Sequence, residues 1–309
     1  MKKVTPCYPG WSSKAITFTI DDGNLVMDQK FLDIVRPAGI KGTFNLCSHA
    51  MDTMSAEEYR AFYEGYEIAN HCKLHPYVFE EGVTYKFADE PFDEATADPD
   101  LLYETDRPQV YYIRMPKGWR RIAEPHAYTA LIAEGQAELE AVFGKGSVRS
   151  FVWPFNERKN RVVKEYLDSV KEYYGVRRSG EYGAEEGFPL PENRRPWHYT
   201  ATHKTLLEKA AQYEALPENG TLKFFCFGVH SIDYENADKW GDLAEFARVY
   251  GNRPQDYFYA TVGEIFDYED AVKQLVITEK AVRNLSAQTV YVRIDNEKIA
   301  LKAGETYLL

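Results

Sequence analysis

The feature that most constrains this chain is a buried strand that ends in two adjacent carboxylates. Residues 15–20 are β-branched and aromatic, as in a buried strand. Asp21, Asp22 and Gly23 follow directly, and Gly23 permits a sharp turn. Two acids at such a place are costly unless a site uses or neutralises them, and α/β proteins build sites at the carboxyl ends of their strands. A solvated Asp–Gly turn is the alternative, and this segment alone does not decide between the two.

The elements that follow predict an α/β fold. A helix is expected over 27–37, a second short apolar strand over 42–47 and another helix from about Ser55. Strand, helix, strand and helix at this spacing indicate right-handed βαβ units and a parallel sheet.

Composition excludes several classes of protein. With 309 residues, 44% of them hydrophobic, the chain can bury one large core or two modest ones. The sequence contains no run of roughly 20 apolar residues, the length needed to span a membrane. The basic start lacks an apolar stretch behind it, so no signal peptide is seen and a cytoplasmic location is expected, with a trimmed export signal left open. A net charge of −11 argues against a nucleic-acid partner. The oligomeric state is left open by the sequence.

Two histidines follow one βα unit further along the chain. His71 and His75 are four residues apart, so on one helical turn both imidazoles would face the same way and could share a metal ion. Cys72 stands where a zinc protease of the HExxH type has its glutamate. A histidine pair alone is more often a surface turn. Together with the upstream aspartates, however, two His and one Asp would leave an open position for water, as in catalytic zinc-type sites.

These segments resemble motifs of a known family. Residues 17–23 (Thr-Phe-Thr-Ile-Asp-Asp-Gly) resemble the first motif of the polysaccharide deacetylases, the NodB-homology carbohydrate esterases of family four. Residues 67–76 (Glu-Ile-Ala-Asn-His-Cys-Lys-Leu-His-Pro) resemble the second motif, and residues 42–45 lie where that family has its second strand. The resemblance covers roughly residues 10–272. It implies a distorted (β/α)7–8 barrel.

The resemblance also implies roles for the acids and the histidines. Asp22, His71 and His75 would hold a divalent metal, with zinc expected and cobalt, nickel or manganese as alternatives. Such an ion would polarise the acetyl carbonyl and activate a water. Asp21 would then act as the general base.

The third motif of the family is only partly present. In residues 150–157, Pro154 and Phe155 match, but the Arg and the Gly of the motif are missing. The backbone N–H at Phe155 would help to hold the oxyanion, and a backbone group survives side-chain changes. Arg178 is a candidate for the missing arginine that orients the catalytic acid. A surface ion pair is an equally good interpretation of Arg178.

A later strand over 224–230 ends in His230, which resembles the last motif of the family. His230 would protonate the leaving group, and Asp233 could hold its other ring nitrogen. Trp197, in a polar and aromatic loop, could line a sugar site, although a packed loop aromatic is the safer interpretation.

Two segments lie outside the resemblance. Residues 77–121 look like an insertion, in which 80–106 holds ten acids against the single Lys86, and 107–121 is basic. The two charge blocks could neutralise each other. The insertion is also predicted to be a lid that narrows the groove, so that short or decorated substrates are preferred to long polymers, because βα loops surround the site in this fold. A surface excursion or a subunit contact is the alternative. Residues 273–309 alternate like strands and predict a small antiparallel β appendage to the 1–272 domain.

The function predicted is metal-dependent hydrolysis of acetyl groups, most readily N-acetyl groups, from a carbohydrate. Two alternatives stay open. The same scaffold could hydrolyse an O-acetyl ester or a small amide, or, because the third motif is altered, the chain could be a non-catalytic relative that binds carbohydrate.

Overall fold

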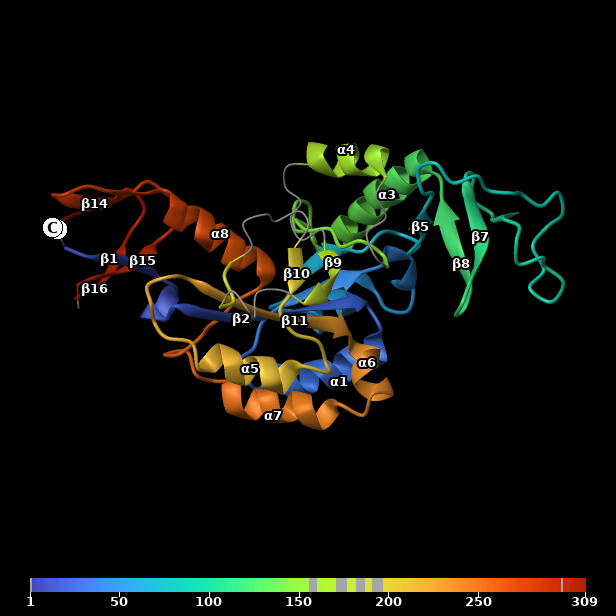
Figure 1. Cartoon of the computed structure of the whole chain (residues 1–309). Helices are drawn as coiled ribbons and strands as arrows, with labels where there is room; N and C mark the ends of the chain where they lie inside the picture. The colour runs from blue at the N-terminus through green and yellow to red at the C-terminus, as the bar shows by residue number, and fades with distance from the viewer. Residues whose placement is uncertain (1, 156–159, 171–176, 182–186, 191–196, 296) are drawn as a thin grey trace.

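A computed structural model describes residues 2–155, 160–170, 177–181, 187–190, 197–295 and 297–309, with the side chains of 177–181 and 197–198 left outside the description. It shows a central parallel sheet covered by helices, with smaller β regions at opposite ends of the molecule (Figure 1). The described part of the chain contains no helix long and apolar enough to cross a membrane.

The central sheet has the strand order β11-β2-β3-β4, and the short β12 pairs with one end of β2. All of these pairings are parallel, as the strand–helix alternation predicted. Single parallel bridges continue the sheet beyond both edge strands, at Asn70–Phe151 and Ala201–Phe227. The strand bounds are β2 (Lys14–Asp22), β3 (Thr43–Leu46), β4 (Glu67–Asn70), β11 (Lys223–His230) and β12 (Phe258–Tyr259).

Helices pack on the faces of this sheet (Figure 1). Ser55 begins α2 with a capping box to Glu58, and Thr261 begins α8 in the same way with Glu264. The helices are α1 (Leu25–Val35), α2 (Ala56–Phe62), α3 (Pro125–Phe143), α4 (Arg161–Ser169), α5 (Leu206–Glu214), α6 (Ser231–Asn236), α7 (Trp240–Tyr250) and α8 (Val262–Lys273).

The core beneath the site is aromatic. Phe18 of β2 lies edge-on to Phe31 of α1 and to Phe44 of β3, with ring centroids 4.9 and 5.3 Å apart. Gly42 is needed here, because a Cβ at that position would lie 2.4 Å from the ring of Phe18. Strands β2 and β3 therefore sit rigidly over a packed layer, which fixes the residues at their carboxyl ends.

The remaining strands form smaller sheets. The segment predicted as an insertion contains the sheet β5-β8-β7-β6, made of β5 (Tyr77–Val78), β6 (Tyr103–Glu104), β7 (Val110–Met115) and β8 (Gly118–Ala123). Strands β9 (Arg177–Glu181) and β10 (Trp197–Tyr199) pair in parallel.

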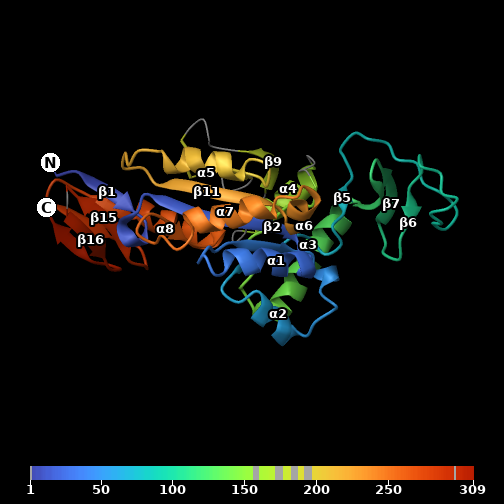
Figure 2. The same ribbon diagram turned by 90° about the horizontal axis from the view of Figure 1, so that it is seen from below.

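The end of the chain forms two three-stranded sheets, and the N-terminal β1 (Val4–Cys7) joins one of them beside β15. The sequence did not predict this pairing, and the domain boundary at residue 272 stays a prediction. The other strands are β13 (Leu275–Ile277), β14 (Ala281–Asn284), β15 (Val290–Ile294), β16 (Glu297–Leu301) and β17 (Thr306–Leu308). Figure 2 shows the two chain ends close together, at the end of the molecule opposite β6 and β7.

Candidate metal centre

The strand register brings three polar residues to one edge of the sheet. His230 of β11 pairs with Asp21 of β2, and Asp21 pairs in turn with Asn45 of β3. These are the carboxyl ends of parallel strands, the edge at which a site was predicted. Asp22, the next residue, has a φ of 79°. A non-glycine residue rarely adopts this conformation, which tends to occur at functional positions.

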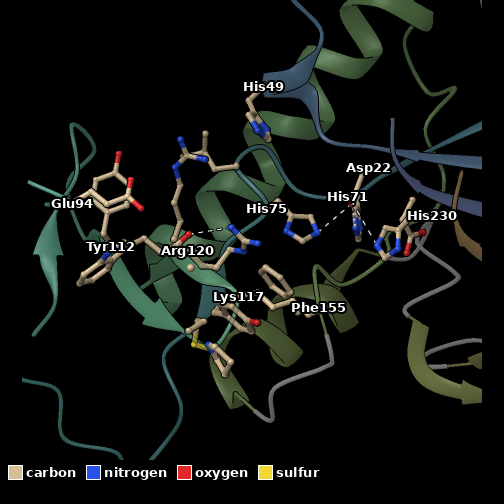
Figure 3. Close-up of a pocket in the computed structure, with 18 of the residues that line it drawn as sticks. Asp22, His49, His71, His75, Glu94, Tyr112, Lys117, Arg120, Phe155 and His230 are labelled. Carbon is tan, nitrogen blue, oxygen red and sulfur yellow. Dashed lines mark hydrogen bonds and ion pairs between the residues drawn. The ribbon is translucent and has the colours of Figure 1, made fainter. Parts of the chain in front are cut away.

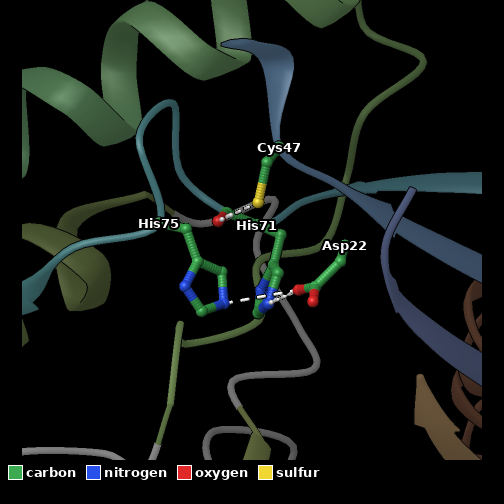
Figure 4. Close-up of side chains that lie close together, drawn as sticks. All are labelled: Asp22, Cys47, His71 and His75. Atoms are coloured by element: carbon green, nitrogen blue, oxygen red, sulfur yellow. Dashed lines mark hydrogen bonds and ion pairs between the residues drawn. The ribbon is translucent and has the colours of Figure 1, made fainter. Parts of the chain in front are cut away.

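Two histidines converge on one oxygen of Asp22. The Nε2 atoms of His71 and His75 lie 3.4 and 3.3 Å from its Oδ1 (Figure 4). These distances are longer than the about 2.7–2.9 Å of a charge-assisted hydrogen bond. Asp22 Oδ1 and His75 Nε2 are both buried and have no hydrogen-bond partner among the described residues. Two unsatisfied buried atoms that face each other call for a ligand between them.

The spacing fits a tetrahedral cation. With bonds of about 2.0–2.1 Å to nitrogen and oxygen, two ligands at the tetrahedral angle lie about 3.3–3.4 Å apart. The distances from Asp22 to the two histidines match this value. The side chain of His71 is 1% exposed, that of His75 is 21% exposed and that of Asp22 is 43% exposed, so the site has a buried floor and an open side. Three protein ligands with an accessible fourth position are the arrangement of a catalytic zinc site.

The second ring nitrogen of His71 is held by the backbone. Its Nδ1 lies 2.8 Å from the carbonyl oxygen of Val152, so Nδ1–H donates there and Nε2 keeps its lone pair for a cation. Burial lowers the pKa of His75, which favours the neutral imidazole that binds metal. Burial alone would raise the pKa of Asp22, but the two imidazoles beside its carboxylate hold that pKa well below its usual range.

The local backbone at the histidines differs from the prediction. His71 and His75 were expected on one helical turn, but residues 71–76 are an irregular loop after β4. Cys72 and His75 have φ values of 64° and 50°. The two rings meet because the backbone reverses at these left-handed residues, so the helical argument was wrong although the convergence it predicted is present. Asn70 stabilises the loop by accepting the N–H of Cys72 through Oδ1.

Cys47 lies beside this group but is directed elsewhere. Ligand atoms of Cys47, Asp22 and the two histidines all lie within 4.8 Å of one another. The thiol donates to the carbonyl oxygen of His71, at 3.4 Å (Figure 4). Burial raises the pKa of Cys47, whereas a metal binds the thiolate. We therefore leave Cys47 out of the ligand set.

Asp21 is buried and held by an amide that sequence reasoning missed. Asp21 is 2% exposed, and Asn45 Nδ2 donates to its Oδ1 at 2.6 Å and to the hydroxyl of Thr19 at 2.7 Å. The signal was present, because Asn45 is a polar residue within an otherwise apolar strand. Its amide fixes the orientation of the carboxylate.

His230 faces Asp22 from the opposite side. Its Nε2 lies 3.7 Å from Asp22 Oδ2, and its Nδ1 lies 2.8 Å from Asp233 Oδ2. The side chain of His230 is 40% exposed. Burial would raise the pKa of Asp233, but the hydrogen bond and charge of His230 lower it overall. Asp233 thus holds the imidazole as the sequence suggested, with Nε2 turned towards the site (Figure 3).

Phe155 forms a wall of the site. Its ring stacks on Tyr77 at 3.8 Å with an interplanar angle of 2°, and lies edge-on to His75 at 4.4 Å. Phe155 has a φ of 58°, and its backbone N–H donates no hydrogen bond to the described residues. That amide is therefore available for an oxyanion, the role predicted for it. Pro154 is buried behind it.

Two further predicted residues cannot be placed. Arg178 lies in β9 and Trp197 in β10, but the side chains of both fall outside the described residues. Their roles stay predictions.

The candidate metal centre lies in a cavity of about 1130 Å³, one wall of which comes from the segment predicted as an insertion (Figure 3). On the barrel side, the cavity is lined by Asp21, Asp22, His49, His71, Leu74, His75, Phe155, Tyr199 and His230. On the other side it is lined by Tyr77, Phe92, Glu94, Tyr112, Arg121 and residues 115–120. The segment therefore borders the site, as the lid prediction requires, while the preference for short substrates stays a prediction.

Comparisons with known proteins identify the family. A family model described as polysaccharide deacetylase matches residues 10–171, slightly more than half of the chain. A search of curated proteins found no match.

Among solved structures, the chain is similar to a family-four esterase domain of a multidomain xylanase from the hindgut metagenome of Trinervitermes trinervoides. The identity is 14%, the alignment covers 84% of this chain and 92% of that chain, and the TM-score is 0.47. A family-four acetyl xylan esterase from Clostridium thermocellum shows 16% identity, coverages of 83% and 92% and a TM-score of 0.42. The peptidoglycan deacetylase PdaC from Bacillus subtilis shows 12% identity, coverages of 84% and 93% and a TM-score of 0.42.

The family model accounts for both the fold and the site motifs. Residues 10–171 include β2 with its paired aspartates and the loop with both histidines. The chain belongs to the polysaccharide deacetylase family, whose fold is a distorted (β/α) barrel and whose members are metal-dependent hydrolases that remove acetyl groups from carbohydrates.

Proposed function

We propose that this protein removes N-acetyl groups from a carbohydrate, with Asp22, His71 and His75 as ligands of one divalent ion, most readily Zn²⁺. The observation that carries the proposal is the convergence of two imidazole Nε2 atoms on Asp22 Oδ1 at 3.3 and 3.4 Å, beside a second, buried carboxylate. Nitrogen and carboxylate donors in this number suit zinc. A bound ion supplies Lewis acidity for the acetyl carbonyl and for water.

The two aspartates have different roles in this proposal. Asp22 is a ligand, while Asp21, held by Asn45, accepts the proton of the attacking water. Asn45 donates to Oδ1 of Asp21 and fixes the plane of the carboxylate. Proton transfer to a carboxylate held in this way needs little reorganisation.

His230 serves as the general acid. Because its Nδ1 is engaged by Asp233, Nε2 is the atom that delivers a proton to the departing amine. The backbone N–H of Phe155 donates to the carbonyl oxygen as negative charge develops on it. The proton taken by Asp21 and the proton given by His230 together convert an acetamide and water into acetate and an amine.

The first test combines metal content with acetate release. Purified protein is analysed for metals, then assayed with an N-acetylated and an O-acetylated oligosaccharide before and after chelation. We expect one equivalent of metal, faster release from the N-acetylated substrate, and loss of activity on chelation with recovery on adding Zn²⁺. Faster release from the ester would instead identify an O-acetyl esterase. No release from either substrate by metal-loaded protein would support a binding role.

Variants make this test specific to the proposed ligands. His71→Ala and His75→Ala should lose both the metal and the activity. His126→Ala is the matched control, because His126 is exposed at the start of α3 and does not line the cavity. A full equivalent of metal in both ligand variants would show that the ion is held elsewhere.

A further inference from the structure

The wall of the cavity contributed by β7 and β8 is strongly basic, although the protein is acidic overall. Residues 111–123 contain Arg114, Lys117, Arg120 and Arg121 and no acid, in a chain of net charge −11. Three of them, all except Arg114, line the cavity that contains the metal ligands. The charges therefore gather at the place where substrate must enter.

These cations are not neutralised by the acidic loop before them. Among the described residues, no carboxylate lies within ion-pair distance of Lys117, Arg120 or Arg121. The printed hydrogen bond of the Arg120 guanidinium is to the carbonyl oxygen of Trp119, at 3.1 Å. Arg107, earlier in the same segment, behaves differently, because it pairs with Glu134 at 2.7 Å. The self-neutralisation that the two charge blocks could have provided is thus absent at the cavity wall in the described part of the chain.

The hairpin is built to present these side chains. Pro116 and Lys117 form the turn between β7 and β8, Gly118 begins β8 with a φ of 115°, and six residue pairs connect the two strands in antiparallel register. Aromatic contacts support the hairpin: the ring of Phe92 stacks on Tyr112 of β7 at 4.3 Å and lies edge-on to Trp119 of β8 at 5.0 Å. In Figure 3, Arg120 reaches from the hairpin towards His75, and Lys117 lies on the side of Phe155.

The acids around the cavity do not cancel this charge. Asp21 and Asp22 belong to the proposed metal centre, where a bound divalent cation would offset their charge. Glu94 is the remaining carboxylate among the described lining residues, and it lies near Tyr112, away from His75 (Figure 3). Arg121 lies on the side of His49, where its charge helps to lower the pKa of that histidine after the larger effect of burial.

We propose that Lys117 and Arg120 form an oxyanion-binding subsite, and that the substrate is an acetylated carbohydrate with an anionic group on a unit next to the acetylated one. A carboxylate or a phosphate or sulfate ester would satisfy the same donors, because each offers oxygens to a guanidinium and an ammonium. The inference rests on the proposed deacetylase function for its reaction, while the binding site itself stands on the hairpin geometry.

The test compares matched substrates. Three N-acetylated oligosaccharides of equal length are used: one neutral, one with alternating uronic acids and one with ester sulfates. Because Lys117 and Arg120 are exposed, the loss of one contact is screened. We expect Arg120→Gln and Lys117→Gln to raise KM for the anionic substrates about two- to fivefold, with kcat and neutral-substrate kinetics unchanged. The anionic substrate whose KM rises more shows whether the subsite prefers a carboxylate or a sulfate ester. High salt should reduce the advantage of the anionic substrates.

Arg114→Gln is the matched control, since Arg114 is exposed on the same hairpin, lies over the Trp119 ring and does not line the cavity. Calorimetric binding of the deacetylated anionic and neutral products gives a readout that does not need catalysis. Charge-dependent binding that the Arg120 and Lys117 variants lose supports the subsite even if no acetate is released. Equal binding of anionic and neutral products would overturn the subsite, and so would an Arg114→Gln effect as large as that of Arg120→Gln. In either case, acetate release from the neutral substrate would leave the proposed deacetylase function intact.

Discussion

Asp21 and Asp22 are adjacent in sequence, yet the end of β2 sends them to different partners. Asp21 is still in the strand register and accepts from Asn45 in the neighbouring strand. Asp22, the last residue of β2, still pairs with Leu46 but has a left-handed φ of 79°, and its carboxylate faces the two histidines. A strand alternates its side chains between faces, so this turn at Asp22 is what brings both carboxylates to one cavity.

Substitution should therefore separate the two aspartates. Asp21→Asn keeps the shape but removes the base, so the metal should stay bound while kcat falls by about 10²–10⁴-fold. Asp22→Asn removes a charged ligand, so metal affinity itself should fall. Metal titration and steady-state kinetics on both variants check this. Loss of metal from Asp21→Asn with normal affinity in Asp22→Asn would mean that the roles are exchanged.

His230 should affect turnover more than binding. Without its imidazole the departing amine lacks a proton donor, so His230→Ala should lower kcat by about 10²-fold or more, with metal content and KM nearly unchanged. Asp233→Asn should have a smaller effect, because it loosens the ring without removing it. Steady-state kinetics on the N-acetylated substrate measure both. Unchanged turnover of His230→Ala would make this histidine structural.

Most of these side chains could be predicted from the sequence, because each one follows an apolar strand and polar residues at such positions are rarely accidental. Asn45 was not predicted as a site residue, because its role depends on which strand lies beside β2. The positive φ values of the histidine loop could not be predicted from the sequence either. They follow from packing around β4 and α3, where Gly135 leaves room for Asn70 and Lys73. Spacing alone therefore suggested a helix.

At the scale of elements, a buried acid joins two helices to the site. Asp28 of α1 is fully buried and accepts from Ser231, the first residue of α6, at 2.6 Å. It also accepts from Tyr63, just after α2, at 2.8 Å. Burial raises the pKa of Asp28 to about 7, against the opposing effect of these hydrogen bonds. Because Ser231 follows His230 directly, this link holds the end of β11 in place.

The raised pKa of Asp28 predicts a pH-dependent stability. The folded protein holds this proton more tightly than the unfolded chain, so stability is greatest at acidic pH and falls as pH rises from about 4 to about 7. Asp28→Asn can still accept from Ser231 and can donate to Tyr63, and it never ionises. It should match the parent near pH 4, exceed it increasingly from pH 5 upwards, and exceed it at pH 8 by up to a few kcal/mol, on the order of several degrees in Tm.

Thermal unfolding of both proteins across pH 4–8 measures the difference. Asp33→Asn serves as a control, because Asp33 is exposed on the same helix. A difference in Tm between Asp28→Asn and the parent that is constant with pH would show that Asp28 does not titrate in this range.

Local sequence pattern identified the main strands and helices but not their long-range partners. The strands at 15–20, 42–47 and 224–230 were recognised because β-branched and aromatic runs are typical of buried strands. The partner of β1 could not be recognised, because its four residues include Pro6 and no local signal connects them to residue 290. Pro6 is consistent with the position of β1 at the edge of its sheet, where a missing N–H is tolerated.

At the scale of the whole molecule, β1 protects the edge of β15. The sheet order β1-β15-β16 places β15 in the middle, paired on both sides. Removing residues 1–7 should therefore expose a strand edge, lower Tm and promote aggregation, while the metal ligands, which belong to the central sheet and the loop after β4, are untouched. Differential scanning calorimetry and light scattering test this, with removal of residues 1–2 as the control. Equal Tm and scattering for the two truncations would show that β1 contributes nothing.

The pairing of β1 with β15 also sets an order of events during translation. Val4 pairs with Ile294, so the two partners are about 290 residues apart in sequence. At roughly 5–20 residues per second, the ribosome makes the second strand about 15–60 seconds after the first. The metal ligands from β2 to the histidine loop are made early in this interval and the general acid His230 late in it. The metal ligands are thus complete before the general acid has been synthesised. The β1–β15 pair forms only after every catalytic residue has been made.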